Sequence, residues 1–301
     1  MHSEKNAIFV KRNNYNLNNM KLRNIFAVTL VSLLLSACGT TRTVPITGRK
    51  QNLLVTDEQI LSLSTQEYTK YMQSAKISTD ATNTALVKKV GQNLAGAVET
   101  YLRANGLSSE LNNFKWEFNL VQDKSVNAFC MPGGKIVVYE GLLPVTQDEA
   151  SLAIVLGHEI AHAVAKHSAE QISKQMKAQY GIQALSVAGA VAGIDTNTTS
   201  ALAQIFAAGF QFRSLKYSRD NESEADYMGL IFAAMAGYNP EVAVTFWKRM
   251  AASSGNSNQS DMFSDHPSDA KRIAAIQQQL PEAMKYYKPA TSTKTTKTTK
   301  K

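Results

Sequence analysis

The sequence predicts a mostly α-helical protein with one small β-sheet, an α+β fold, and two observations support this prediction. Long stretches of the 301-residue chain repeat apolar residues at the spacing of one helix face. Segments with the alternation or the β-branched residues of a strand are short, and they lie between residues 114 and 139. Hydrophobic residues make up 44% of the chain and charged residues 19%, which is enough apolar material for one substantial core.

The helices are predicted from apolar periodicity and from the glycines and prolines that interrupt it. Residues 148–178 are expected to form one long helix, because this stretch holds no proline and a single glycine. The other predicted helices cover residues 57–76, 82–104, 199–236 with a break near residues 213–217, and 241–250.

The predicted sheet has two recognisable parts. Residues 114–120 alternate apolar and polar side chains, as a half-buried strand does. Residues 135–139 are rich in β-branched side chains and follow Pro132, Gly133 and Gly134. The proline and the two glycines predict a tight turn that joins two paired strands.

The net charge of +8 lies at the two ends of the chain. Residues 1–37 carry a net charge of +4 and the residues after Tyr287 carry +5, so the body between them is close to neutral at −1. A basic groove that follows a phosphate backbone is therefore not expected, and nucleic acid is excluded as a predicted partner.

The N-terminal residues have the pattern of a targeting segment. Lys21 and Arg23 precede an apolar run that is too short for a membrane span, which needs about 20 apolar residues. The run ends in Leu35-Ser36-Ala37-Cys38, which resembles the lipobox of bacterial lipoproteins. That resemblance implies a lipid on Cys38, and Gly39 after it fits sorting to an outer membrane. The alternative is a buried N-terminal helix with a chance cysteine.

These patterns give a domain organisation. Residues 1–37 are a predicted signal peptide, with Met20 a better start than Met1, and residues 38–56 are a lipidated cysteine and a polar linker. Residues 57–287 form the predicted catalytic domain, and residues 288–301 form a Lys/Thr tail of low complexity that is expected to be disordered. With Cys38 acylated, Cys130 is a free thiol, read as a small buried hydrophobe or, alternatively, a redox or metal-trapping group.

The chemistry of the chain is indicated by His158-Glu159-Ile160-Ala161-His162, which lies in a strongly helical stretch. The two histidines fall on one helix face a turn apart, so both imidazoles can bind one zinc ion. Glu159 then lies beside the metal, where it can act as general base toward a zinc-activated water. His167 is about 180° around an uninterrupted helix from His158, so it is expected on the solvated surface.

A third ligand is expected near residues 218–226. Glu222 and Asp226 are four residues apart on a predicted helix, so one can bind zinc while the other orients a ligand histidine. Glu224 lies about 200° around that helix from Glu222 and should point away. Taken alone, this segment is better explained as a solvated acidic face, and the ligand interpretation is preferred only because the segment accompanies the His-Glu-x-x-His motif. Arg219 and Arg272 are candidates for fixing carboxylates, or for ordinary structural ion pairs.

These motifs resemble the gluzincin family of zinc peptidases that includes HtpX, the CAAX prenyl endopeptidases, BepA and LoiP, and within it the compact lipoprotein branch. The family pattern His-Glu-x-x-His followed by Glu-x-x-Ala-Asp is matched at residues 158–162 and 222–226. The resemblance implies a zincin-type fold in which the active-site helix packs against the sheet. It implies one zinc ion per chain, held by His158, His162 and Glu222, with Asp226 orienting an imidazole.

The resemblance extends to two other segments. It implies a substrate cleft bordered by residues before the second strand, where the substrate pairs with the sheet edge. These residues are Asn127, Ala128, Phe129, Pro132, Gly133 and Gly134. His266, before Pro267, has three readings: a plug in the open zinc position, an oxyanion donor, or an ordinary helix-start histidine.

The predicted function is zinc-dependent hydrolysis of peptide bonds, with Glu159 moving the proton. The resemblance implies that the substrates are misfolded or misassembled envelope proteins and that the enzyme is anchored at the periplasmic face of the outer membrane. The alternative is an envelope chaperone or assembly factor that keeps the zinc site but cuts rarely, with His266 as the plug. The sequence does not indicate an oligomeric state.

Overall fold

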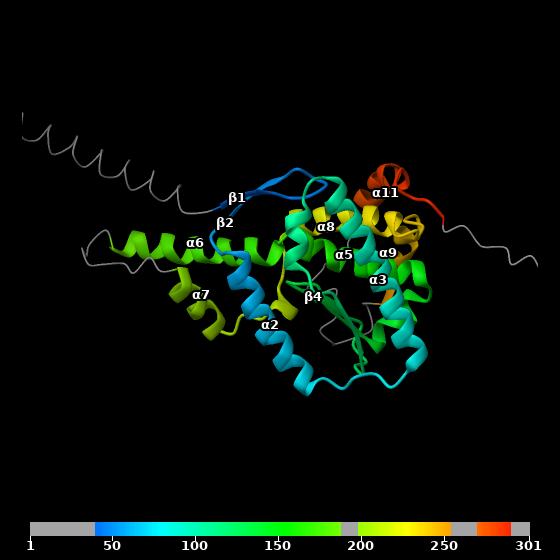
Figure 1. Cartoon of the computed structure of the whole chain (residues 1–301), viewed down its shortest axis with the longest axis horizontal. Helices are drawn as coiled ribbons and strands as arrows, with labels where there is room; N and C mark the ends of the chain where they lie inside the picture. Colours follow the sequence, from blue (N-terminus) through cyan, green and yellow to red (C-terminus); the bar gives the residue numbers. More distant parts are fainter. Residues whose placement is uncertain (1–39, 188–197, 254–269, 290–301) are drawn as a thin grey trace, which may run out of the picture. The chain divides into compact units, whose positions relative to one another are not determined.

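The computed structural model describes residues 40–187, 198–253 and 270–289 (Figure 1). The predicted signal peptide, Cys38 and His266 lie outside the described residues, as do nearly all residues of the predicted tail. The chain divides into two units, residues 1–41 and residues 42–301, and the fold and site described below belong to the second. No helix among the described residues has both the length and the apolar character of a membrane span.

The described residues form helices and a few short strands, as the sequence predicts. The strands are β1 (Thr40–Thr43), β2 (Lys50–Leu53), β3 (Glu117–Val121), β4 (Ala128–Met131) and β5 (Lys135–Tyr139). The helices are α2 (Asp57–Ser74), α3 (Ala81–Ala104), α4 (Leu143–Thr146), α5 (Glu149–Val164), α6 (His167–Val187), α7 (Thr198–Ala207), α8 (Arg219–Met235), α9 (Val242–Ser253) and α11 (Ala270–Met284). Short 3-10 turns are η1 (Ser108–Asn113), η2 (Glu140–Leu142) and η3 (Phe212–Ser214).

The sheet has the order β3-β5-β4, so β4 is an edge strand. Strands β3 and β5 run parallel, while β4 and β5 form an antiparallel hairpin that confirms the predicted strand pair. Gly133 and Gly134 have positive φ angles of 93° and 79° in the turn, a conformation that favours glycine. A Cβ atom at Gly134 would also lie 2.5 Å from the Trp116 ring.

The two faces of the sheet belong to two hydrophobic clusters, because successive residues of a strand point to opposite faces. Ile136 and Val138 of β5 pack in the larger cluster together with helix α5. Val137 and Tyr139 pack on the other face, in the cluster that contains residues of α2 and α6. The active-site helix α5 thus packs against the sheet, and the predicted fold class is confirmed.

The prediction of one long helix over residues 148–178 is wrong, because α5 ends at Val164 and a second helix, α6, begins at His167. Lys166 between them has a φ angle of 54°, in the left-handed region that side chains rarely adopt. Its Nζ atom lies 2.8 Å from Asp57 and 2.7 Å from Glu110, and these ion pairs hold the turn. Neither proline nor glycine marks this break.

Residues 40–56, which the sequence predicts as a polar linker, are also ordered against the fold. Strands β1 and β2 pair with each other, and Val44 between them is only 1% exposed within the larger core cluster. Leu53 and Val55 are buried in the second cluster. The isolated apolar residues of this segment are buried in the two clusters. They are too few to form a recognisable strand pattern in the sequence.

Helices α5 and α8 make the most extensive contact in the fold. A Cβ atom at Gly157 would lie 2.8 Å from the backbone oxygen of Gly229, and one at Gly229 would lie 2.7 Å from the backbone nitrogen of His158. Only glycine fits such a contact, so the backbones of the two helices cross in direct contact at Gly157 and Gly229. This crossing places the functional residues of both helices side by side.

Candidate metal centre

Helix α5 presents His158 and His162 on one face, as their spacing predicts, and both are 1% exposed. Asp148 caps the helix by accepting a hydrogen bond from the backbone N–H of Ser151, at 2.6 Å. Nearly all residues of α5 are buried, so the helix is held on several sides and its side chains have fixed positions.

Helix α8 supplies the acidic residues of the site. Ser218 caps its N-terminus by accepting from the backbone N–H of Asn221 at 3.2 Å. Glu222 and Asp226 lie on the face that meets α5, and both are buried. The glycine crossing of the two helices therefore brings carboxylates from one helix against imidazoles of the other.

His158, His162 and Glu222 each offer one ligand atom to a common point, and these atoms all lie within 4.8 Å of one another. The Nε2 atoms of the two histidines are 3.1 Å apart, and each lies 3.4 Å from an oxygen of Glu222. Four ligands at 2.0–2.1 Å in a tetrahedron lie about 3.3–3.4 Å from one another. The spacing and the N₂O donor set therefore fit one zinc ion.

The charge of the site supports the same conclusion. Glu159, Glu222 and Asp226 are buried carboxylates, and Arg272 is the buried cation that faces them. With neutral histidines, these groups carry a net charge of −2. A buried excess of negative charge is costly unless a cation compensates it, and a divalent metal ion matches it.

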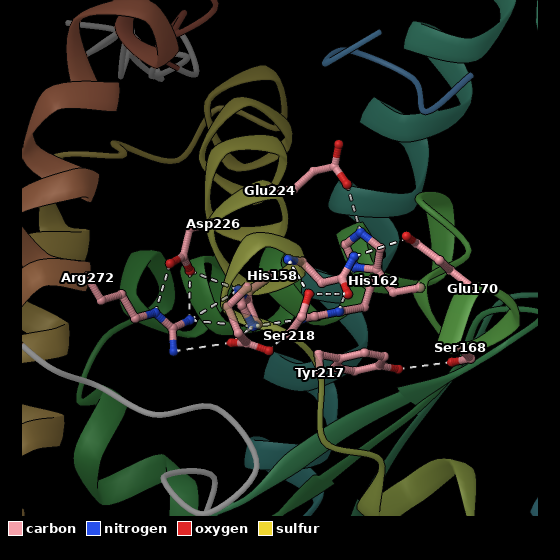
Figure 2. A network of polar contacts seen from close by, with 12 residues as sticks. His158, His162, Ser168, Glu170, Tyr217, Ser218, Glu224, Asp226 and Arg272 are labelled. Atoms are coloured by element: carbon pink, nitrogen blue, oxygen red, sulfur yellow. Dashed lines mark hydrogen bonds and ion pairs between the residues drawn. The ribbon is translucent and has the colours of Figure 1, made fainter. Parts of the chain in front are cut away.

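His158 is held by a direct branch of polar contacts, which Figure 2 shows on one side of the site. Its Nδ1 atom lies 2.9 Å from Oδ1 of Asp226. Arg272 binds both oxygens of Asp226, through Nε at 2.8 Å and Nη2 at 2.7 Å. The guanidinium also stacks on the Trp247 ring, with Cζ 3.7 Å from the ring centroid. Asp226 therefore contacts an imidazole of the site, at the position that the sequence prediction requires of the orienting carboxylate.

His162 is held by a second, longer branch that sequence reasoning missed. Its Nδ1 atom lies 2.8 Å from Nδ1 of His167, and Nε2 of His167 lies 2.9 Å from Oε2 of Glu224. The prediction of a solvated His167 is wrong, since this side chain is fully buried. The break at Lys166 redirects the chain, so the helical angle between His158 and His167 no longer applies. Glu224, labelled in Figure 2, is not among the residues whose ligand atoms converge, which agrees with the prediction that it does not share the position of Glu222.

The pKa values of the two histidines move in opposite directions. Burial lowers the pKa of His158, but Asp226 and Glu222 raise it more, to about 9. Burial lowers the pKa of His162 well below its ordinary value, although the Glu222 carboxylate, which accepts a hydrogen bond from the imidazole, acts in the opposite direction. Because a metal binds the deprotonated imidazole, loading the site releases a proton chiefly from His158.

Tyr217 is a further residue of the site that the sequence analysis did not identify. Its ring stacks on the His162 ring with centroids 4.0 Å apart and an interplanar angle of 20°. Its hydroxyl lies 2.9 Å from the Ser168 hydroxyl (Figure 2). Burial raises the pKa of Tyr217, and the nearby Glu159 carboxylate raises it further. Tyr217 therefore fixes the face of the His162 ring.

Glu159 is buried and lies toward the sheet. Burial raises the pKa of the Cys130 thiol well above its ordinary value, and the Glu159 carboxylate contributes to that increase. Cys130 is on β4 and packs in the larger core cluster, which agrees with its reading as a small buried hydrophobe. The Glu159 carboxylate is thus close enough to the edge strand β4 to act on the Cys130 thiol.

The predicted cleft residues lie on or next to β4, but they do not all face the metal ligands. Pro132 and Gly133 line a small cavity of about 30 Å³ together with His162. Ala128 packs in the cluster on the side of α5, whereas Phe129 packs on the opposite face of the sheet. A larger cavity, of about 230 Å³, is lined by Glu222, Asp226 and Arg272, with Tyr217, Arg219, Ser223, Lys271 and Ala275. The other two predicted residues are Asn127, which precedes β4, and Gly134, in the turn.

Comparison with known proteins covers the part of the chain that contains this site. Residues 87–280 match the family described as peptidase family M48. The chain is 40% identical over 176 residues to the mitochondrial metalloendopeptidase OMA1 of Schizosaccharomyces pombe, which covers 58% of this chain and 50% of that protein. The metalloprotease LoiP of Escherichia coli is 30% identical over 177 residues, 59% of this chain and 68% of LoiP.

A putative beta-barrel assembly-enhancing protease of Vibrio cholerae is 32% identical over 154 residues, 48% of this chain and 31% of that protein. The chain therefore spans about half the length of the Schizosaccharomyces pombe relative and less of the Vibrio cholerae protein. LoiP belongs to the predicted resemblance, whereas the mitochondrial relatives were not expected from the sequence.

Proposed function

Because this chain belongs to peptidase family M48, we propose that it is a zinc-dependent endopeptidase that hydrolyses peptide bonds of cell-envelope proteins. The observation that supports the proposal most strongly is the set of three buried ligand atoms from His158, His162 and Glu222. Their separations of 3.1–3.4 Å match the spacing around a tetrahedral zinc ion. Zinc bound there would act as a Lewis acid that activates a water and polarises the scissile carbonyl.

Glu159 is the residue proposed to move the proton. It follows His158 directly on α5, and its carboxylate is close enough to strand β4 to raise the pKa of the Cys130 thiol. In this position it takes a proton from the attacking water and donates it to the leaving amine nitrogen. Asp226 and Arg272 hold His158 in place during this step, and the buried surroundings exclude other water.

The proposed substrate is an extended polypeptide that pairs with the edge strand β4. The backbone N–H of Tyr139 donates to the backbone oxygen of Asn127, so these two residues face each other as a hydrogen-bonded pair. The next such pair, two residues along each strand, is Phe129 and Val137. The backbone groups of Ala128 and Cys130 are therefore directed to the outer side of the strand. A substrate added there would gain main-chain hydrogen bonds largely independent of its sequence, which suits proteins that have lost their native fold.

The envelope location rests on the N-terminal sequence. The lipobox-like residues before Cys38 support a lipid anchor, and Gly39 supports the periplasmic face of an outer membrane. Two relatives are bacterial proteins, LoiP of Escherichia coli and the putative beta-barrel assembly-enhancing protease of Vibrio cholerae, and this supports a bacterial envelope location. The proposed partners are thus polypeptide substrates and, through the lipid, a membrane.

The proposal is tested with residues 39–301 of wild type, Glu159→Gln and His266→Ala, by measuring zinc content and casein cleavage. We expect about one zinc per chain in all three proteins and no cleavage by Glu159→Gln, because the proton acceptor is lost. Faster cleavage by His266→Ala would identify His266 as the plug. Bound zinc without cleavage in any variant would favour the chaperone function, and absence of zinc would overturn the proposal.

A further inference from the structure

We propose that His167, Glu224 and Arg49 form a positioning chain for the ligand His162, so that the proposed zinc site depends on residues of the segment 44–56. This inference rests on the proposed function, since it assumes that His162 binds the metal. His167 and Arg49 lie outside the two sequence motifs that supply the ligands and the base, and Glu224 occupies a position within the second motif that the family pattern does not specify. Each step of the chain is a polar contact between buried or half-buried groups.

The direction of the hydrogen bonds is determined by the ligand. An imidazole that binds a metal through Nε2 carries its proton on Nδ1 and needs an acceptor there. Nδ1 of His167, 2.8 Å away, is that acceptor, so the proton of His167 is on Nε2. Nε2 then donates to Oε2 of Glu224 at 2.9 Å. Every nitrogen in the chain has one defined role, and the chain ends on a carboxylate.

The carboxylate of Glu224 is itself fixed from the other end of the sequence. Thr47 donates to its Oε1 atom at 2.5 Å, and Nε of Arg49 donates to its Oε2 atom at 2.8 Å. Arg49 also binds both oxygens of Glu170 on α6, at 3.0 and 2.8 Å. Two carboxylates from separate helices thus hold one guanidinium, which gives the chain a rigid end.

The backbone around His167 fits a positioning role. Lys166 adopts a left-handed conformation that costs energy for a lysine, and its ion pairs with Asp57 and Glu110 compensate for that cost. The turn starts α6 with His167 directed at His162. On the other side, Tyr217 stacks on the His162 ring. His162 is therefore fixed at its edge by His167 and at its face by Tyr217.

The experiment measures the zinc dissociation constant by competition with a chromophoric chelator, using wild type, His167→Phe and His167→Asn. Phe fills the space of the ring but cannot accept a hydrogen bond, whereas Oδ1 of Asn can take the place of Nδ1. We expect His167→Phe to weaken zinc binding about 10–100-fold, and His167→Asn to recover much of that loss. The visible spectrum of the cobalt-substituted protein should change in the same order, because it reports the geometry around the metal.

The control is Glu170→Gln, which removes the other carboxylate held by Arg49 without touching an imidazole. It should leave zinc affinity within about threefold of wild type, whereas Glu224→Gln should weaken it about tenfold. If His167→Phe does not fold, Glu224→Gln with this control decides the question. If His167→Phe or Glu224→Gln binds zinc as tightly as the wild type does, the positioning chain is overturned. Absence of zinc from the wild type would instead overturn the proposed function.

Discussion

The two branches that hold the histidines of the site differ in length and in burial. His158 contacts a carboxylate directly, and the side chain of Arg272 behind that carboxylate is 7% exposed. His162 reaches a carboxylate only through a second imidazole, and the side chain of Arg49 behind it is 33% exposed. Both branches nevertheless end in a carboxylate fixed by a guanidinium. The comparison indicates that the same chemical task can be done by a single carboxylate in contact with the histidine or by a relay through a second histidine.

The difference has an energetic consequence. The ion pair of the direct branch is desolvated, so neither partner tolerates loss of the other. The ion pair of the longer branch is half-solvated, so water compensates part of any loss. We therefore expect mutations in the direct branch to reduce both metal affinity and stability, and mutations in the longer branch to act mainly on metal affinity.

The largest expected effect is that of Asp226→Asn. The substitution leaves the buried guanidinium of Arg272 without its bidentate partner, which costs about 3–5 kcal/mol of unfolding free energy. Zinc affinity should also fall about 10–100-fold, because His158 loses the charge that orients it. Denaturant unfolding and chelator competition measure the two quantities.

Glu224→Gln in the longer branch is the matched variant for Asp226→Asn. Its cost in unfolding free energy should be only about 1–2 kcal/mol, because Arg49 keeps Glu170 and contact with solvent. Equal losses of stability in the two variants would remove the energetic distinction between the branches.

A loss of stability smaller than that of Asp226→Asn is expected from Gly229→Ala, which should disturb both branches together. The new Cβ atom would lie 2.7 Å from the backbone nitrogen of His158, so α8 must move away from α5. Overpacking of this kind costs about 1–3 kcal/mol of unfolding free energy, and the displaced Glu222 should weaken zinc binding about tenfold.

Gly96→Ala on α3 is the control for the glycine crossing. A Cβ atom there meets nothing within 4 Å, so alanine should stabilise the helix by about 0.5–1 kcal/mol. If Gly229→Ala behaves like Gly96→Ala, the close crossing does not determine the geometry of the site.

The ligand residues and Asp226 follow from the sequence because they lie in short motifs on regular helices. His158, His162, Glu222 and Asp226 are each four residues from their partner, and α5 and α8 keep that spacing in register. The α+β class and the β4–β5 hairpin were predictable for the same reason, since periodicity and turn residues are local signals.

The longer branch did not follow, because it depends on contacts between distant residues. The turn at Lys166 has no glycine or proline to announce it, and its ion partners lie over 50 residues away. Arg49 belongs to a segment whose apolar residues are too few to form a recognisable strand pattern. The sequence alone therefore does not distinguish this segment from a linker. The one available signal is the spacing of His167 from His158. On an uninterrupted helix this spacing predicts that His167 lies on the opposite side from the ligands.

The last expected effect concerns the solvated end of the longer branch and appears as a dependence on pH. Burial raises the pKa of Glu170, but hydrogen bonds from Arg49 and Lys174 lower it more, from 4.5 to about 2. A lowered pKa stabilises the folded protein above about pH 4.5, and this contribution is lost as the pH falls toward 2. Glu170→Gln should therefore cost about 1–2 kcal/mol of unfolding free energy at pH 6–7, since Arg49 and Lys174 are partly exposed. The difference from wild type should shrink toward zero near pH 2 in denaturant titrations at each pH. A difference that stays constant with pH would show that Glu170 acts through packing and that Arg49 is held by Glu224 alone.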